Sequence, residues 1–125
     1  MQSLGGVLPG VRFACDAYVQ LVRERPLVEA VASSLTEFGP DIMARRIAAW
    51  ETHYAWVEAE TLAYFRGRVT RAKEDSREAV DFVLAHARTR AEQERCIDAL
   101  ITKTQILWAL LDALSVAYPL HREEP

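Results

Sequence analysis

The chain has few of the residues that bind metal ions, and it lacks the motifs of several common enzyme classes. Its 125 residues include two cysteines and three histidines, with no CxxC pair and no Glu-x-x-His pair. Zinc and di-iron carboxylate sites depend on such spacings, so we expect no metal. A Walker loop, a GxGxxG loop and a serine nucleophile elbow are also absent. These absences disfavour phosphate-loop nucleotide binding and serine hydrolase chemistry.

Charge of one sign does not dominate, and no segment resembles a targeting signal. The net charge is −3 at pH 7, which provides no broad basic surface for nucleic acid. The N-terminus lacks a basic segment followed by an apolar run, unlike a signal peptide. The longest apolar stretch, residues 106–120, is interrupted by Asp112 and closed by Pro119. It is too short to span a bilayer, so we expect a cytoplasmic protein with no membrane or nucleic-acid partner.

The composition is typical of one soluble globular domain over residues 1–125. Half of the residues are hydrophobic (50%) and 26% are charged. Cys15 and Cys96 both fall on expected helices near apolar neighbours. We expect them to be small core residues in a reducing compartment, although the sequence alone leaves a disulfide between them open.

Hydrophobic residues recur at helical spacing and not at strand spacing, which predicts an all-α bundle of five to six helices. The expected helices cover residues 11–24, 26–37, 41–52 and 58–87, and the last of these either continues or restarts near residue 73. Pro26 and the Gly39-Pro40 pair mark two of the boundaries. Thr89 and Glu92 form a capping box that opens a long last helix, which Pro119 ends.

Apolar residues on each helix define the side that we expect to face the core. These residues are Ala14, Tyr18, Leu21 and Val22 in the first helix; Ile42, Met43, Ile47 and Trp50 in the third; Leu62, Phe65, Val69, Ala79, Val80, Val83 and Leu84 over residues 58–87; and Leu100, Leu107, Leu111 and Tyr118 in the last.

Lys103 is the most informative residue, because it lies in a helix that is apolar almost all round. It falls about 60° from the centre of the stripe of the last helix, with Ile106 and Leu110 on its far side. A lysine there is costly unless it is paired or meets an anionic ligand. The sequence leaves two interpretations open: a long stem that carries the ammonium to water, or a ligand-binding cation.

Three further polar residues have a structural and a functional interpretation. Arg46 lies between Met43 and Trp50 at helical spacing, so we expect it to share their inward side, either covering Trp50 or binding a ligand. Tyr64 and Arg68 are four residues apart and therefore share one face, which points away from the apolar stripe of their helix. They are either a solvated surface pair or part of a site.

Tyr18 lies on the apolar stripe of the first helix, as a core tyrosine or as a site residue. Together the candidates comprise three cations and two phenols: Lys103, Arg46, Arg68, Tyr18 and Tyr64. Such a set around one cavity suits a small polycarboxylate, because guanidinium groups bind carboxylates in a bidentate manner. Lysine and tyrosine can also transfer protons when burial shifts their pKa values.

Several segments together resemble the pyrroloquinoline quinone (PQQ) synthase family, the coenzyme PQQ synthesis protein C family. They occur in order and with similar spacing over nearly the whole chain, and they match what looks like the C-terminal half of a family member. The segments are Leu8-Pro9-Gly10-Val11-Arg12-Phe13-Ala14, Ser33-Ser34-Leu35-Thr36-Glu37, His53-Tyr54-Ala55-Trp56, Tyr64-Phe65-Arg66-Gly67-Arg68 and Leu107-Trp108-Ala109-Leu110-Leu111-Asp112-Ala113.

The resemblance implies a heme-oxygenase-like helical bundle and a cofactor-independent oxidase. The family closes a ring and carries out an eight-electron oxidation of a carboxylate-rich quinoid precursor to PQQ, with oxygen as co-substrate and without a metal or organic cofactor. By resemblance, Arg46 and Arg68 would bind substrate carboxylates. Lys103 would help to position oxygen or peroxide, and Tyr18 and Tyr64 would hydrogen-bond the quinoid and relay protons.

The chain departs from the family pattern at three points. Met43 stands where the family has a histidine, so one acid–base group is missing, and the segment 36–41 is one residue shorter. The N-terminal half of the family pattern has no counterpart in this sequence. A half-bundle exposes apolar helix faces, so we expect a homo-oligomer or a complementing chain that supplies that half. The alternative is a non-catalytic helical module that binds an anionic quinone or metabolite, or a partner protein.

Overall fold

The computed structural model describes residues 6–38 and 42–119, and within these ranges every regular element is a helix. The elements are α1 (Pro9–Glu24), α2 (Leu27–Ser33), the 3₁₀ helix η1 (Ser34–Phe38), α3 (Ile42–His53), α4 (Ala59–His86) and α5 (Arg90–Ala117). The predicted all-α class is confirmed. The Gly39-Pro40 break and the expected helix start at Asp41 lie outside the described residues.

Local chemistry explains where the helices begin and end. Arg25 is extended because it precedes Pro26, so α1 ends at Glu24. The predicted capping box opens α5: the Thr89 hydroxyl accepts from the Glu92 N–H at 3.2 Å, and the Glu92 carboxylate accepts from the Thr89 N–H at 2.9 Å. At the other end of α5, Ala117 is the last helical residue, two positions before Pro119.

Two of the predicted helices differ from the observed ones. Helix α4 (Ala59–His86) is continuous, so the restart near residue 73 does not occur; the helix contains no proline, and Gly67 does not interrupt it. The expected second helix narrows to a 3₁₀ turn from Ser34 onward. The hydroxyls of Ser33 and Ser34 both bond carbonyls three residues back, which is the kind of local competition that loosens an α-helix.

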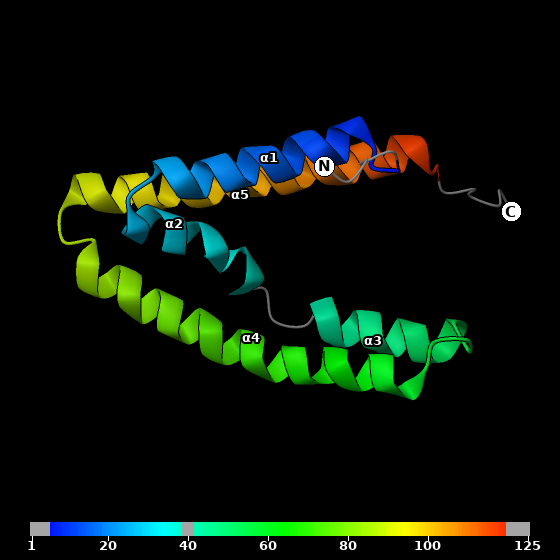
Figure 1. Ribbon diagram of the computed structural model, residues 1–125. Coiled ribbons are helices and arrows are strands. Elements are labelled where there is room, and N and C mark those ends of the chain that lie inside the picture. The colour runs from blue at the N-terminus through cyan, green and yellow to red at the C-terminus, as the bar shows by residue number, and fades with distance from the viewer. Residues whose placement is uncertain (1–5, 39–41, 120–125) are drawn as a thin grey trace, which may run out of the picture.

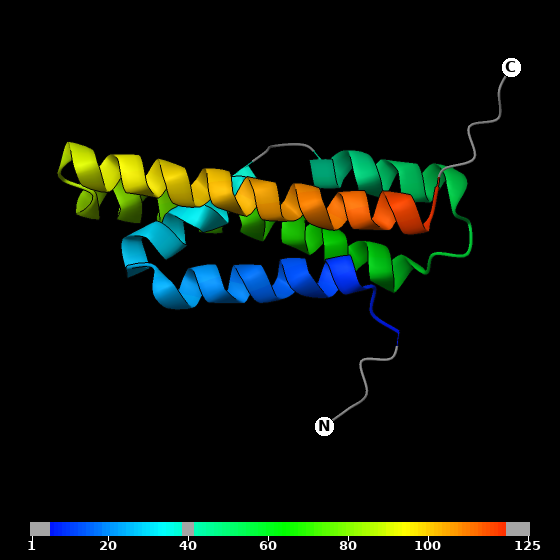
Figure 2. The ribbon, with the colours of Figure 1, turned by 90° about the horizontal axis from the view of Figure 1, so that it is seen from above.

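The helices form two pairs joined by a short middle segment. α1 packs along α5, and α3 packs along α4, while α2 and η1 contact both α4 and α5. Figure 1 shows the two pairs lying apart, with α2 and η1 between them; in Figure 2, seen from above, α5 lies over part of α4. An ion pair between Arg66 and Glu51 adds to the α3–α4 contact.

The core is small and lies where α2, α4 and α5 meet. Ala32, Ala87 and Cys96 are buried there, and Val28 and Val83 pack against them. A buried carboxylate secures the same region. Glu29, 2% exposed, accepts from Arg25 at 3.2 Å and from Arg95 at 2.9 Å, so it ties α2 to the end of α1 and to α5.

Many of the expected core residues are exposed instead. Ala14, Leu21, Ile47 and Leu62 are buried, as predicted, but Val22, Ile42, Leu84, Leu107, Leu111 and Tyr118 are exposed. Their helices have apolar residues on more sides than the described elements cover. The prediction for the cysteines holds in part: Cys96 is buried, Cys15 is exposed, and both thiols are free, so no disulfide joins them.

α5 has the length and composition of a membrane-crossing helix, with 28 residues and a mean hydropathy of 1.3 in its most apolar window. The apolar stretch 106–120, which is too short to span a bilayer, is only the C-terminal part of the apolar region, because the helix begins far upstream at Arg90. Only 6% of that window is buried. Core helices of larger helical proteins have the same composition, so this observation alone assigns no membrane.

Candidate functional site

Lys103 and Tyr18 come together between α5 and α1. The Lys103 ammonium lies over the Tyr18 ring, 2.8 Å from the ring centroid, and both residues are half-buried. The negative face of an aromatic ring attracts a cation in this position, most strongly where water is scarce. Lys103 therefore does not extend its ammonium straight into bulk water. It has a partner that itself presents a hydroxyl.

The antiparallel register of α1 and α5 explains this contact. At one end of the pair, a Cβ on Gly10 would lie 2.6 Å from the Ala113 Cβ, so the two backbones are as close as a glycine allows. At the other end, Arg25 donates to Asp98 at 2.9 Å. Tyr18 lies midway between Gly10 and Arg25. The register fixed at both ends therefore places its ring opposite Lys103.

Lys103 also lies closer to the buried side of α5 than the sequence suggested. Ala99, one turn before it, is 0% exposed, and Ile106 and Leu110 are half-buried. The stripe of Leu107, Leu111 and Tyr118, which was expected to face inward, is exposed. The covered face of α5 is thus rotated toward Lys103.

The other three candidates lie on the α3–α4 pair. Tyr64 is exposed, and its ring contacts Phe65 edge to face at 5.2 Å, while Phe65 contacts Trp50 at 4.8 Å. Arg68 is half-buried and has an interaction partner. Arg46 is exposed, so its predicted inward position beside Trp50 is wrong. It lies about 40° around α3 from Trp50, and α4 covers only the side centred on Ile47.

The structure therefore unites two of the five candidates and places three on the other helix pair. Lys103 and Tyr18 belong to α5 and α1, whereas Arg46, Tyr64 and Arg68 belong to α3 and α4, which lie apart from them in Figure 1. A site formed by all five would need its ligand to contact both pairs.

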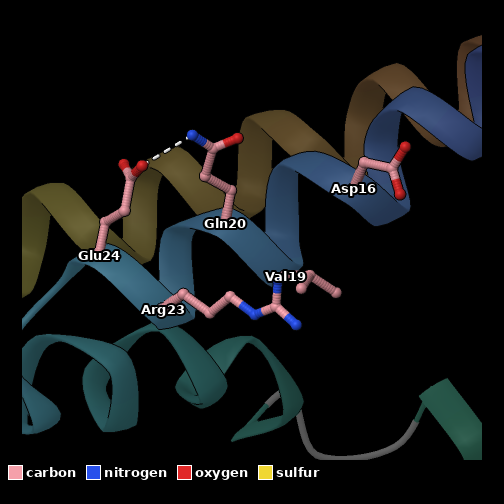
Figure 3. Close-up of a pocket in the computed structure, with 5 residues that line it drawn as sticks. All are labelled: Asp16, Val19, Gln20, Arg23 and Glu24. Carbon is pink, nitrogen blue, oxygen red and sulfur yellow. Dashed lines mark hydrogen bonds between the residues drawn. The ribbon is translucent and has the colours of Figure 1, made fainter.

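A shallow depression lies on α1 and includes none of the candidates. Figure 3 shows the five residues that line it, and all come from one helix: Asp16, Val19, Gln20, Arg23 and Glu24. The Gln20 amide donates to Glu24 at 2.7 Å. Because one exposed helix supplies every lining residue, the depression is a surface feature and not an enclosed site.

Burial and ion pairing shift the pKa of two groups near Glu29. Desolvation raises the pKa of the Cys96 thiol, and the nearby Glu29 carboxylate acts in the same direction, so Cys96 is a poor nucleophile. Hydrogen bonds to Asp98 and then Glu29 raise the pKa of Arg25, which stays charged. The burial of Glu29 was not predicted, because a single acid in a short helix gives no periodic signal of burial.

Residues 6–38 and 42–119 contain no group of three or more histidine, cysteine, aspartate or glutamate side chains able to hold a metal ion. The candidate residues in the described part of the chain are cations and phenols, with aromatic rings beside Tyr64. These groups suit the binding of an anionic, planar molecule.

The chain belongs to the TENA/THI-4/PQQC family, whose model matches residues 3–113. Helices make up the regular structure described above, in agreement with the heme-oxygenase-like helical fold of that family. This match confirms the family that the ordered motifs indicated.

Several curated relatives are pyrroloquinoline-quinone synthases. The chain is 49% identical over 117 residues to that of Pseudomonas aeruginosa (strain LESB58), covering 93% of this chain and 47% of the relative. It is 53% identical over 117 residues to that of Rhizobium meliloti (strain 1021), with coverages of 93% and 46%. To that of Granulibacter bethesdensis it is 48% identical over 119 residues, covering 94% of this chain and 47% of the relative. The chain spans about half the length of the curated relatives it matches.

Proposed function

We propose that this chain is the part of a PQQ-synthase-type oxidase that carries Lys103 and Tyr18, and that it acts together with a complementing half. The reaction would be the last step of PQQ synthesis, in which oxygen oxidises a carboxylate-rich quinoid precursor, in the cytoplasm and without a metal or organic cofactor. The proposal is supported by 49% identity to the P. aeruginosa synthase and by the cation–π contact of Lys103 with Tyr18.

The Lys103–Tyr18 contact suits a reaction in which negative charge develops on oxygen. A fixed ammonium in a partly dry environment stabilises an oxyanion or peroxide more than it would in water. The ring holds the ammonium in place, while the phenol hydroxyl can hydrogen-bond the quinoid or pass on a proton. Catalytic roles are therefore proposed for Lys103 and Tyr18, and for Tyr64 across the substrate.

The α3–α4 pair would bind the opposite side of the substrate. Arg46 and Arg68 are cations on that pair, and bidentate guanidinium–carboxylate bonds would orient the precursor. Tyr64 belongs to the aromatic group with Phe65 and Trp50, which suits a planar quinoid. The proposal requires the α1–α5 pair and the α3–α4 pair to contact one ligand from two sides.

Oxygen uptake with the precursor tests this function. The chain, co-expressed with the unmatched part of the P. aeruginosa relative, should consume oxygen and form quinone absorbance. We expect Lys103→Met to lower kcat at least 100-fold, because the developing charge loses its cation. Lys73→Met, an exposed lysine on α4, serves as the matched control and should leave kcat unchanged. Absence of turnover in the co-expressed wild type would remove the catalytic proposal.

A second candidate is a non-catalytic helical module that binds an anionic quinone. The observation that favours it is Met43, a side chain that cannot transfer protons, in the place where the family pattern has histidine. Calorimetry with PQQ separates the two functions. Binding that Arg68→Ala weakens, in a protein without oxygen uptake, supports the module, whereas turnover supports the oxidase.

A further inference from the structure

α5 has a second apolar face on the side opposite to its covered one. Ile97, Ile101, Trp108 and Leu111, called the outer stripe below, are each more than half exposed. At 100° per residue they fall within an arc of about 80°, roughly on the other side of the helix from Ala99. Apolar residues on two opposite faces are typical of a helix that is covered on both of them, inside a larger bundle or in a bilayer.

The burial of α5 agrees with a missing cover. The helix has 28 residues, and only 6% of its most apolar window is buried. The outer stripe is part of this uncovered apolar surface, because Ile97 (58%), Ile101 (51%), Trp108 (68%) and Leu111 (57%) are all exposed.

The charges beside the outer stripe favour a protein over a lipid as the occupant. Glu94 and Asp112 lie about 40° around the helix from Trp108, and Asp98 lies about 80° away. Acidic side chains within the apolar length of a helix are expensive in a hydrocarbon core, where an aspartate at the helix centre costs several kcal/mol. At a protein interface they form an ordinary polar rim.

The same acidic edge disfavours a second copy of this chain. In an antiparallel two-fold pairing of α5 with α5, like edges face each other. Glu94 and Asp98 of one copy would then approach Asp112 of the other. Like charges in such positions are unfavourable. A partner helix with an apolar stripe and a basic edge avoids this repulsion.

We propose that the outer stripe of α5 is the docking surface for a helical segment from the half that the relatives have and this chain does not match. The matched region covers only 47% of the P. aeruginosa relative, so more than half of that protein remains to pack against the equivalent of this chain. α5 then has two covers: α1 and α2 on the Lys103 side, and the complementing segment on the Trp108 side. The stripe touches no proposed catalytic group.

Co-expression tests the docking surface without substrate. The probe is the unmatched part of the P. aeruginosa synthase, expressed with an affinity-tagged copy of this chain. We expect a 1:1 complex in sedimentation, and at least a tenfold lower yield of that complex with Trp108→Glu. Leu84→Glu is the matched control, because Leu84 is an equally exposed apolar residue (73%, against 68% for Trp108) on α4. Circular dichroism verifies that both variants keep their helix content.

Each outcome decides the proposal. A complex that Trp108→Glu disrupts and Leu84→Glu does not supports it, as does a probe that is soluble only when the wild-type chain is present. No complex with the wild type overturns it, and so does equal sensitivity of the two variants. A homodimer that is lost in Trp108→Glu, or flotation with phosphatidylglycerol vesicles, assigns the stripe to another occupant. The inference shares the complementing half with the proposed function, but assembly without turnover would refute only the catalytic proposal.

Discussion

α4 and α5 are both 28 residues long, but the sides that other helices leave uncovered differ in composition. α4 buries one side, around Leu62 and Ser76, and most of its outer side carries charge. The charged outer residues include Arg71, Lys73, Glu74, Asp75, Arg77, Glu78 and Asp81, all exposed. α5 buries Cys96 and Ala99 on one side and presents Ile97, Ile101 and Trp108 on the other. Only α4 therefore has the charged outer side that is typical of a surface helix.

The comparison shows that helix length and one covered face do not define a helix's final environment. The composition of the remaining surface does. Charged residues on the outer side of α4 are stable in water, whereas the outer stripe of α5 costs solvation free energy until something covers it. The following predictions test whether the two helices differ in this way, in order of decreasing effect.

The largest expected effect on stability is the removal of the buried carboxylate under α5. Glu29→Ala should lower the free energy of unfolding by about 3 kcal/mol, because it removes the acceptor of both Arg25 and Arg95 from a buried position. Urea denaturation followed by circular dichroism measures this change. Glu78→Ala, on the charged side of α4, is the control and should change the free energy by no more than about 0.5 kcal/mol. Equal effects would mean that the Glu29 ion pairs contribute nothing.

Glycine substitutions distinguish the close contact of α5 from the open surface of α4. Gly10→Ala should destabilise by about 1–2 kcal/mol, because the new Cβ would meet the Ala113 Cβ at 2.6 Å and force α1 away from α5. Gly67→Ala should stabilise by about 0.5–1 kcal/mol, because its Cβ meets nothing within 4 Å and alanine favours the helix. Thermal unfolding of both variants measures the opposite signs. Two shifts of the same sign would contradict the proposed register.

The N-termini of the two helices should differ in their response to acid. Hydrogen bonds from the Thr89 backbone and hydroxyl lower the pKa of Glu92 below its ordinary value of 4.5, whereas α4 has no side-chain cap. The lowered pKa means that the charged Glu92 stabilises the folded state above pH 4.5, and that this contribution is lost as the pH falls through the lowered value. Thr89→Ala should cost about 1 kcal/mol at pH 7.

Chemical denaturation at several pH values between 7 and 3 measures this dependence. The stability difference between the wild type and Glu92→Gln should be present at pH 7 and should shrink toward pH 3. A difference that stays constant over this range would show that the capping box does not depend on the charge of Glu92.

Local signals made much of the fold predictable. Pro26, the Thr89–Glu92 box and Pro119 predicted helix ends because each acts within one or two turns, through proline sterics or backbone hydrogen bonds. The sequence did not decide whether α4 is continuous or restarts near residue 73. Residues 58–87 contain only one weak helix breaker, Gly67, six residues before the suspected restart. Helix periodicity also located Lys103 on an inward arc of α5.

The packing of the helices against one another could not be predicted from these local signals. Periodicity shows which residues share a helix face, but it does not show whether another element covers that face. For this reason Leu84 and Ile42 were predicted to be buried and are exposed. Arg46 was misplaced in the same way. Tyr18 as the partner of Lys103 was not predictable either, because it follows from the register set by the Gly10–Ala113 contact and the Arg25–Asp98 ion pair.

Fluorine NMR of the chain labelled with 5-fluorotryptophan tests most directly whether α5 is a central helix with two covers. The chain has three tryptophans, and Trp108→Phe identifies the signal from the outer stripe. In the isolated chain, that signal should shift between H₂O and D₂O, as expected for a solvated ring. In the complex with the complementing half, it should move and lose its solvent isotope shift. A Trp108 signal that keeps its full isotope shift in a stable complex would contradict the account.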